Sequence, residues 1–239
     1  MPSSFWDKCC DFFVKGFKST FITEDRYLLF LKGIGNTLLV ALFATLIGVI
    51  IGCLVALVKT VHKQNPHKLV VLNWICELYT TVIRGTPVVV QLLITYNIIF
   101  RFSTHAVLIG IIGFGLNSGA YVSEIIRAGI NAVDIGQTEA GRSLGFSWKT
   151  TMTRIVLPQA VRNVLPAIAN EFISLLKETS VIGYLGVMDL TKAADRVISR
   201  TANVYFPYIS IALIYLAMVC ILNFFVKKLE KRLAQSDRG

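Results

Sequence analysis

The side chains best suited to chemistry lie inside long apolar segments, above all within residues 155–185. On a helix that turns by 100° per residue, amide, hydroxyl and ammonium groups there fall within about 40° of one another, and two carboxylates form a neighbouring stripe. The first set is Asn163, Asn170, Ser174 and Lys177, and the second is Glu171 and Glu178. This pattern predicts a helix that is polar along one side over four turns and carries both signs of charge.

A second polar group surrounds a helix breaker in residues 69–100. Pro87 lacks a backbone donor and therefore frees carbonyl groups, which protein or cavity water must satisfy. Gly85 permits the bend, and broken helices often flank ligand sites in transporters. The polar side chains beside the break are Arg84, Thr86 and Gln91. The break either contributes to a ligand site or only bends the chain.

The two groups together suit a zwitterion. A carboxylate needs a cation or a helix N-terminus, and an ammonium needs a carboxylate. Lys177 or Arg84 could take the first role, and Glu178 or Glu171 the second. The alternative is that these charges form internal ion pairs that hold a helix bundle together.

Composition places these residues in a membrane protein. Of 239 residues, 54% are hydrophobic and 16% are charged, whereas soluble domains carry about 25% charged residues. The high hydrophobicity excludes intrinsic disorder, and five irregularly placed cysteines exclude a disulfide scaffold. The net charge of +10 suits anionic lipid and cytoplasmic loops better than nucleic acid.

Five segments are long and apolar enough to cross a bilayer, which takes about 20 residues. Three are almost free of charge, namely 33–58, 102–123 and 201–226. The other two, 69–100 and 155–185, hold the charged residues described above, and such charges usually face a bundle interior or a cavity. The sequence therefore predicts an all-α membrane protein with five transmembrane helices.

The ends of the chain differ in character. Phe5, Trp6, Phe12, Phe13 and Phe17 lie near helical spacing with lysines between them, which predicts an amphipathic helix on the membrane surface. Basic residues after the last span predict a cytoplasmic C-terminus, so five spans place the N-terminus outside. The expected division is an N-terminal amphipathic segment (1–32), a transmembrane domain (33–228) and a cytoplasmic tail (229–239).

The cytoplasmic loop between the third and fourth spans holds a compact motif. Thr138 can cap a short helix that runs to Leu144, and Glu139 suits the positive end of that helix. Gly145 stands where a glycine ends a helix, and Ser147 can cap the next one. On composition alone this segment is either a docking helix for a soluble partner or a plain amphipathic connector.

The sequence shows no motif of an enzyme that works alone. Walker A loops, His-Glu-x-x-His, nucleophile elbows and Cys/His clusters are all missing from the 239 residues. Two Gly-x-x-x-Gly pairs lie in the predicted spans, Gly48/Gly52 in the first and Gly115/Gly119 in the third. Each pair predicts that its span packs closely against a neighbouring helix.

The loop motif resembles the signature loop of ABC importer permeases. Glu139-Ala140-Gly141, three residues, Gly145, nine residues and 155–158 (Ile-Val-Leu-Pro) match the spacing of that signature. Gly141 departs from the usual alanine, and glycine is a poorer helix former by about 1 kcal/mol. The resemblance implies a coupling helix that seats in a cleft of an ATP-hydrolysing subunit. The implied coupling residues are Glu139, Ala140, Gly141, Arg142 and Gly145.

Four further segments, 35–38, 77–87, 119–129 and 172–181, resemble polar amino acid permeases of the histidine/glutamine/arginine type. The resemblance implies a type I importer permease of the bacterial inner membrane, with five spans and the N-terminus outside. It implies a second permease copy or homologue, two ATP-binding subunits inside, and a substrate-binding protein or lipoprotein outside. No cofactor is expected in this chain, since ATP and Mg would bind the partner ATPase, and no nucleic acid is expected.

The resulting hypothesis is the transmembrane subunit of an ATP-driven importer for polar amino acids. Its candidate substrate pathway comprises Arg84, Thr86, Gln91, Asn170, Glu171, Ser174, Lys177 and Glu178. One alternative is a secondary transporter in which the Glu and Lys side chains inside the membrane couple transport to protons or sodium ions. A second is a membrane scaffold without transport activity, and a third is an ABC permease for another small zwitterion, such as cystine or an opine.

Overall fold

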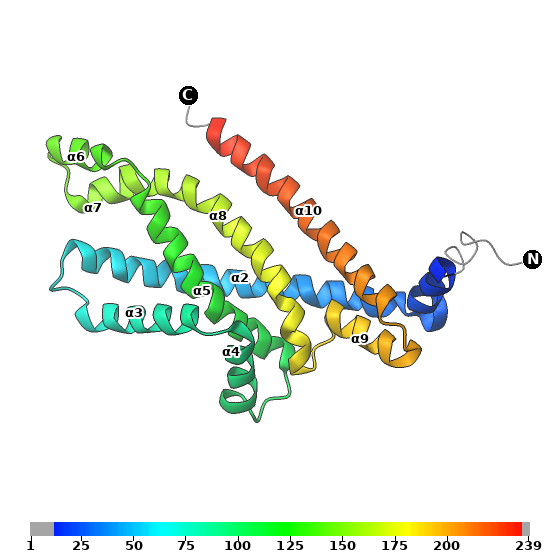
Figure 1. The fold of residues 1–239 in the computed structure, drawn as a ribbon. Coiled ribbons are helices and arrows are strands. Elements are labelled where there is room, and N and C mark those ends of the chain that lie inside the picture. The colour runs from blue at the N-terminus through cyan, green and yellow to red at the C-terminus, as the bar shows by residue number, and fades with distance from the viewer. Residues whose placement is uncertain (1–11, 236–239) are drawn as a thin grey trace, which may run out of the picture.

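The computed structural model describes residues 12–235, and each regular element in that range is a helix (Figure 1). Residues 12–17 are helical and lead into η1 (Lys18–Ile22) and η2 (Thr23–Asp25). The four long helices are α2 (Tyr27–Gln64), α5 (Ala106–Asn131), α8 (Leu157–Glu178) and α10 (Tyr205–Gln235). The shorter ones are α3 (Val70–Gly85), α4 (Val88–Ile94), η3 (Thr95–Ile99), α6 (Ile135–Ser143), α7 (Trp148–Thr151), η4 (Met152–Val156), η5 (Thr179–Leu185) and α9 (Leu190–Thr201).

Three helices of the described range are long and apolar enough to cross a membrane: α2, α5 and most of α10. A fourth span forms if α3 and Val88–Ile99 count as one broken helix, bent by 112°. Helix α8 has 22 residues, about 33 Å at 1.5 Å per residue, but it carries four charged side chains. The all-helical membrane fold is confirmed, and the count of five spans stays a prediction.

Helices α2 and α5 form the most extensive helix–helix contact among the described residues, and their glycines explain why. A Cβ placed on Gly48 would lie 2.7 Å from the Ser118 hydroxyl oxygen, and one on Gly52 would lie 2.6 Å from a Val122 methyl. On the other side of the contact, the side chains of Ile47 and Ile51 of α2 pack against Gly115 and Gly119 of α5. The predicted packing role of both Gly-x-x-x-Gly pairs is therefore confirmed, because any side chain would push the helices apart.

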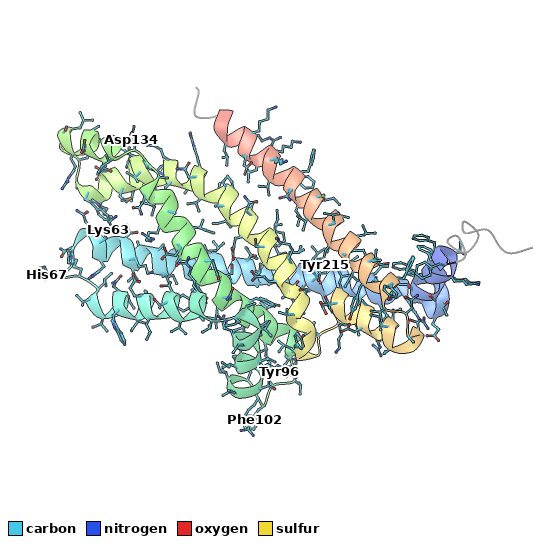
Figure 2. The ribbon with its side chains drawn as sticks, viewed as in Figure 1. Lys63, His67, Tyr96, Phe102, Asp134 and Tyr215 are labelled. Atoms are coloured by element: carbon cyan, nitrogen blue, oxygen red, sulfur yellow. The ribbon has the colours of Figure 1, made fainter. Side chains whose placement is uncertain are left out.

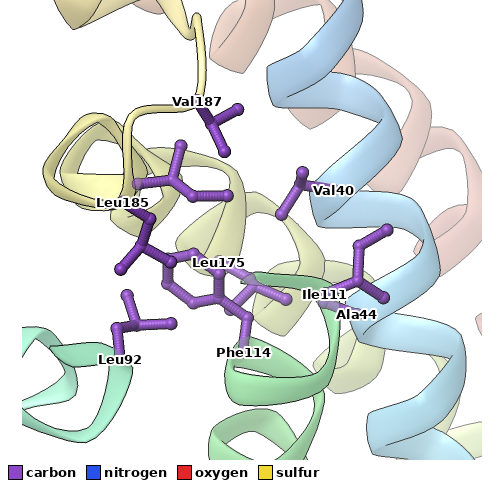
Figure 3. Packing of buried hydrophobic residues seen from close by; sticks show 9 residues of the cluster. Val40, Ala44, Leu92, Ile111, Phe114, Leu175, Leu185 and Val187 are labelled. Carbon is purple, nitrogen blue, oxygen red and sulfur yellow. The ribbon is translucent and has the colours of Figure 1, made fainter. Parts of the chain in front are cut away.

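A buried apolar cluster joins five elements beside this pair (Figure 3). Phe114 of α5 is fully buried, and it packs with side chains from α2, α4, α8 and η5. The members are Val40, Ala44, Leu92, Ile111, Phe114, Leu175, Ile182, Leu185 and Val187. Lipid is as apolar as these side chains, so close van der Waals packing rather than escape from water holds this cluster together.

Helix α9 was not predicted from the sequence, because residues 186–200 lie between two predicted spans and carry several charges. Its apolar side is fully buried against Phe30 of α2 and Ile211 of α10. Asp189 caps the helix by accepting the backbone N–H groups of Thr191 and Lys192 at 3.1 and 3.0 Å. The last span accordingly begins at Tyr205 rather than at residue 201.

The N-terminal segment is described only from residue 12. Phe5 and Trp6, two members of the expected amphipathic helix, lie outside the described residues, whereas Phe12, Phe13 and Phe17 are exposed on the helical stretch. Helix α2 begins at Tyr27 and runs without interruption past residue 33. The division of the chain at residues 32/33 and 228/229 stays a prediction.

Candidate functional site

The break between α3 and α4 is bridged by one side chain. The Gln91 amide donates to the carbonyl oxygens of Ile83 and Thr86 at 2.7 and 3.0 Å, and it lies 2.8 Å from the Thr86 hydroxyl. Thr86 itself donates to the carbonyl of Val82 at 2.8 Å. Protein side chains thus satisfy the carbonyls that Pro87 frees. Thr86 and Gln91 therefore stabilise the break between α3 and α4.

Helix α5 supplies two polar side chains that sequence reasoning missed. Asn117 is buried and donates to the Gln91 carbonyl oxygen at 3.0 Å, which orients the amide that bridges the break. Ser118 is fully buried and donates to the Glu171 carboxylate of α8 at 3.1 Å. Both are short polar residues in an otherwise apolar helix, and this contrast could have marked them as functional candidates. Their partners could not be predicted, because they lie far away in the sequence.

The polar side of α8 is largely open in the single chain. Asn170, Lys177 and Glu178 are exposed, and Glu171 and Ser174 are half-buried. The predicted stripe therefore runs along a surface, with both signs of charge at its end. A polar face on a membrane helix needs water, a ligand or another chain against it, because lipid cannot solvate it.

Arg84 lies elsewhere, in a cavity formed by residues of α2, α3 and α5. The cavity has a volume of about 560 Å³ and is lined by Lys59, His62, Lys63, Asn73, Glu77, Thr80, Thr81, Arg84, Glu124 and Arg127. The Arg84 guanidinium stacks over the Tyr121 ring, 5.5 Å from its centroid. The single chain therefore does not bring Arg84 into one site with the α8 stripe.

Lys59 is the centre of the polar contacts in that cavity, and it too was missed. Its buried ammonium lies 3.1 Å from Glu124, 3.4 Å from Glu77 and 3.0 Å from the Thr80 hydroxyl. Arg127 pairs with the second Glu124 oxygen at 2.6 Å. Lys59 of α2 thus contacts polar side chains of both α3 and α5, and buried ions require such partners.

The loop motif folds as a helix followed by a sharp turn, with one correction to its start. The helix begins at Ile135 and is capped by Asp134, whose carboxylate accepts the Gly136 N–H at 2.6 Å, so Thr138 is not the cap. Aspartate is a better N-cap residue than threonine, and Asp134 directly precedes the first helical residue. Figure 2 shows Asp134 at the same end of the molecule as Lys63 and His67.

The end of α6 is as expected. Gly145 has a φ of 78°, its N–H donates to the Arg142 carbonyl, and the Phe146 N–H donates to the Gly141 carbonyl at 3.1 Å. These two bonds form a Schellman motif, which requires a left-handed residue. Ser147 then caps α7 by accepting the Thr150 N–H at 3.2 Å, as expected.

Gly141 has a positive reason to be glycine. It is buried, and a Cβ added to it would lie 2.7 Å from the Thr151 methyl and 2.8 Å from the Thr151 hydroxyl. The departure from the usual alanine therefore allows α6 to approach α7 closely. The other candidate coupling residues, Glu139, Ala140, Arg142 and Gly145, are exposed.

The same loop exposes large apolar side chains to water. Ile135 and Leu144 are 75% and 74% exposed, and Phe146 is 47% exposed. Large exposed apolar groups that lie close together are typical of surfaces that contact another molecule. Sequence reasoning named the polar residues of this helix and overlooked these three.

Charged side chains join the N-terminal segment to α9 at the other end of the molecule. Glu24 lies 3.2 Å from Arg26 and 2.8 Å from Arg200. The hydrogen bond and charge of Arg26, aided by Arg200, lower the pKa of the Glu24 carboxyl. Burial raises the pKa of the Asp189 carboxyl, opposed by the backbone N–H groups that it accepts.

Comparisons with known proteins agree with this architecture. Residues 48–235 match the family described as the binding-protein-dependent transport system inner membrane component. A putative glutamine transport system permease protein of Rickettsia typhi is 40% identical over 213 residues, which cover 87% of this chain and 94% of that protein. An arginine transport system permease protein of Bacillus subtilis is 39% identical over 210 residues, covering 87% and 93%.

Solved structures agree as well. An amino acid ABC transporter crystallised with histidines shares 40% identity and a TM-score of 0.81, covering 89% of this chain and 98% of that chain. A methionine ABC transporter in an inward-facing conformation shares 16% identity and a TM-score of 0.73, which shows a common fold alone.

The chain therefore belongs to the family of binding-protein-dependent transport system inner membrane components. Within that family it is an ABC transporter permease subunit, a multi-pass protein of the inner membrane, as the resemblance of its loop and span motifs implied. Its relatives are named as permeases rather than as enzymes.

Proposed function

We propose that this chain is the transmembrane subunit of an ATP-driven importer for polar amino acids, of which glutamine and arginine are the first candidates. The relatives named for those two amino acids are each about 40% identical and are covered over more than nine tenths of their length. The observation that carries the proposal is the open polar side of α8, where Asn170, Lys177 and Glu178 offer groups for both ends of a zwitterion.

The open stripe also favours a dimer. A second permease copy, or a close homologue, that lays its own α8 opposite would enclose the two polar faces in one pathway, and twofold pairing is the usual arrangement of such assemblies. Glu171, held by Ser118 at 3.1 Å, would line the wall of this pathway together with Ser174. The polar groups would then face each other instead of lipid.

Two ATP-binding subunits would bind the exposed side of α6, one on each permease. Glu139, Ala140, Arg142 and Gly145 would provide polar and backbone contacts, and Ile135 and Leu144 would provide apolar ones. Closure of the ATPase pair around ATP and Mg would then rock the permeases between two states. On this topology α6 and the C-terminus are cytoplasmic, and the N-terminus and α9 are external, where a binding protein or lipoprotein delivers the amino acid.

The proposal is tested by reconstituting the chain in liposomes with a candidate ATPase and an amino-acid-binding protein. ATP hydrolysis should rise with glutamine or arginine and stay at its basal rate with amino acids outside the accepted set. Stimulation by cystine or an opine alone would keep the class and change the cargo. Uptake driven by an ion gradient without any ATPase would contradict the proposal and favour a secondary transporter.

The docking step has its own test. Glu139→Lys should reduce co-purification of the ATPase, because it reverses a charge on the exposed side of α6. Glu230→Lys makes the same charge change on the exposed surface of α10 and serves as the control. Equal co-purification with both variants would argue against α6 as the coupling helix.

A further inference from the structure

Helix α9 presents a row of positive charges on its free side. Lys192, Arg196 and Arg200 are spaced four residues apart and are all exposed, and we call them the basic stripe. Arg200 pairs with Glu24, and Lys192 and Arg196 are exposed on the same helix. Like charges at this spacing destabilise a helix by a few tenths of a kcal/mol, which an acidic partner would reverse.

A recess lies beside the stripe and shares Lys192 with it. It has a volume of about 420 Å³ and is lined by Ser180, Val181, Gly183, Tyr184, Thr191, Lys192 and Asp195. Tyr184 stands at the recess and is 74% exposed. Exposed tyrosine beside basic side chains is typical of protein interfaces, where its ring contributes apolar area and its hydroxyl a hydrogen bond.

The position of the recess connects it to the candidate pathway. Its residues on η5 begin two positions after Glu178, at the end of the polar stripe of α8. Figure 1 shows α9 at the end of the molecule opposite to α6. A molecule seated on this surface would therefore stand over the end of the pathway that lies away from the ATPase.

A lipid surface is a poor candidate for the occupant. Helices that lie on membranes insert their apolar side among the acyl chains. The apolar side of α9 is instead fully buried in the protein, through Leu190, Ala193, Ala194 and Val197. Because Asp189 caps the helix at the same time, the stripe is held on a rigid support that suits protein docking.

We infer that the basic stripe and the Tyr184 recess form the docking surface for an acidic face of the external amino-acid-binding protein. This inference rests on the proposed function and adds to it the location and the charge of the contact. Charge complementarity of this kind mainly accelerates association and fixes orientation, and it weakens as salt rises.

The test uses the permease–ATPase complex in nanodiscs, with the purified amino-acid-binding protein of the same cell loaded with glutamine or arginine. The variant K192E/R196E should raise the half-maximal binding-protein concentration for ATPase stimulation at least fivefold at low salt, and less at high salt. Basal ATP hydrolysis should not change. The charge-preserving K192R/R196K should behave like the wild type, and K228E/R232E repeats the same charge reversal on exposed residues of α10 as a control.

Three outcomes would overturn the inference. One is equal stimulation of K192E/R196E and the wild type at every salt concentration. Another is a loss of stimulation together with a change in the number of permease copies per particle, which would make this face a contact between copies. The third is a loss that appears only in nanodiscs with anionic lipid. If the wild type shows no amino-acid-dependent ATP hydrolysis, the proposed function itself fails, and the variants then need not be compared.

Discussion

The side-chain amide of Gln91 donates to the carbonyl oxygen of Ile83 at 2.7 Å, across the point where α3 ends and α4 begins. Asn117 of α5 holds the same side chain through its carbonyl oxygen at 3.0 Å. A helix that turns by 112° inside the membrane region thus keeps its freed backbone groups satisfied.

Gln91→Ala should lower the free energy of unfolding by about 1–3 kcal/mol, because it leaves the buried Asn117 amide and the half-buried Ile83 carbonyl without this partner. Thermal unfolding of the purified protein in detergent measures this loss. Asn97→Ala is the matched control, since Asn97 also donates an amide to a backbone carbonyl, that of Leu93, but on an exposed stretch of helix. Equal losses in the two variants would show that Gln91 does not stabilise the break.

Lys59→Met should lower the free energy of unfolding by about 1–3 kcal/mol, because it removes the buried ammonium from Glu124 and from the Thr80 hydroxyl, whereas Arg127 stays paired with Glu124. Adding Glu124→Gln should recover part of that loss, which a double-mutant cycle of unfolding free energies detects. Lys63→Met, one turn further along α2 on an exposed site, should change little. Additive losses for Lys59 and Glu124 would contradict a coupled pair.

Gly141→Ala should weaken binding of the ATPase even though alanine is the better helix former. The new methyl group would lie 2.7 Å from the Thr151 methyl and would force α6 away from α7. The double variant Gly141→Ala/Thr151→Ala removes the obstruction and should restore binding, as co-purification of the two subunits would show. If the single variant binds the ATPase as well as the wild type does, then α6 and α7 accommodate the methyl group without weakening binding.

Glu178→Gln should reduce amino acid uptake by tenfold or more and leave assembly with the ATPase intact. The variant keeps the shape of the side chain and removes the charge that would bind an ammonium group at the end of the α8 stripe. Uptake by proteoliposomes is the measurement, and Glu230→Gln, on an exposed site of α10, is the control. Uptake at the wild-type rate would remove Glu178 from the pathway.

Local sequence predicted several parts of this protein correctly because their causes are local. Apolar length marked the long helices, the Arg84–Pro87 run marked the break, and Gly145 marked the end of α6 by its left-handed backbone. The helix start was misplaced from Asp134 to Thr138, because two residues of the right type stood within one turn of each other. Helix α9 was missed because a short amphipathic helix resembles a charged loop until its apolar side has something to pack against.

Residue types and their spacing were enough to predict a helical membrane protein with an ABC permease loop and a polar stripe on α8. Other features became visible only once the helices were packed. Lys59 pairs with Glu77 and Glu124, Asn117 holds the Gln91 side chain at the break, and Arg84 lies apart from the stripe. The physical reason is distance along the chain. Helical periodicity tells which side chains share a face, but the packing of α2 against α5 decides which faces meet.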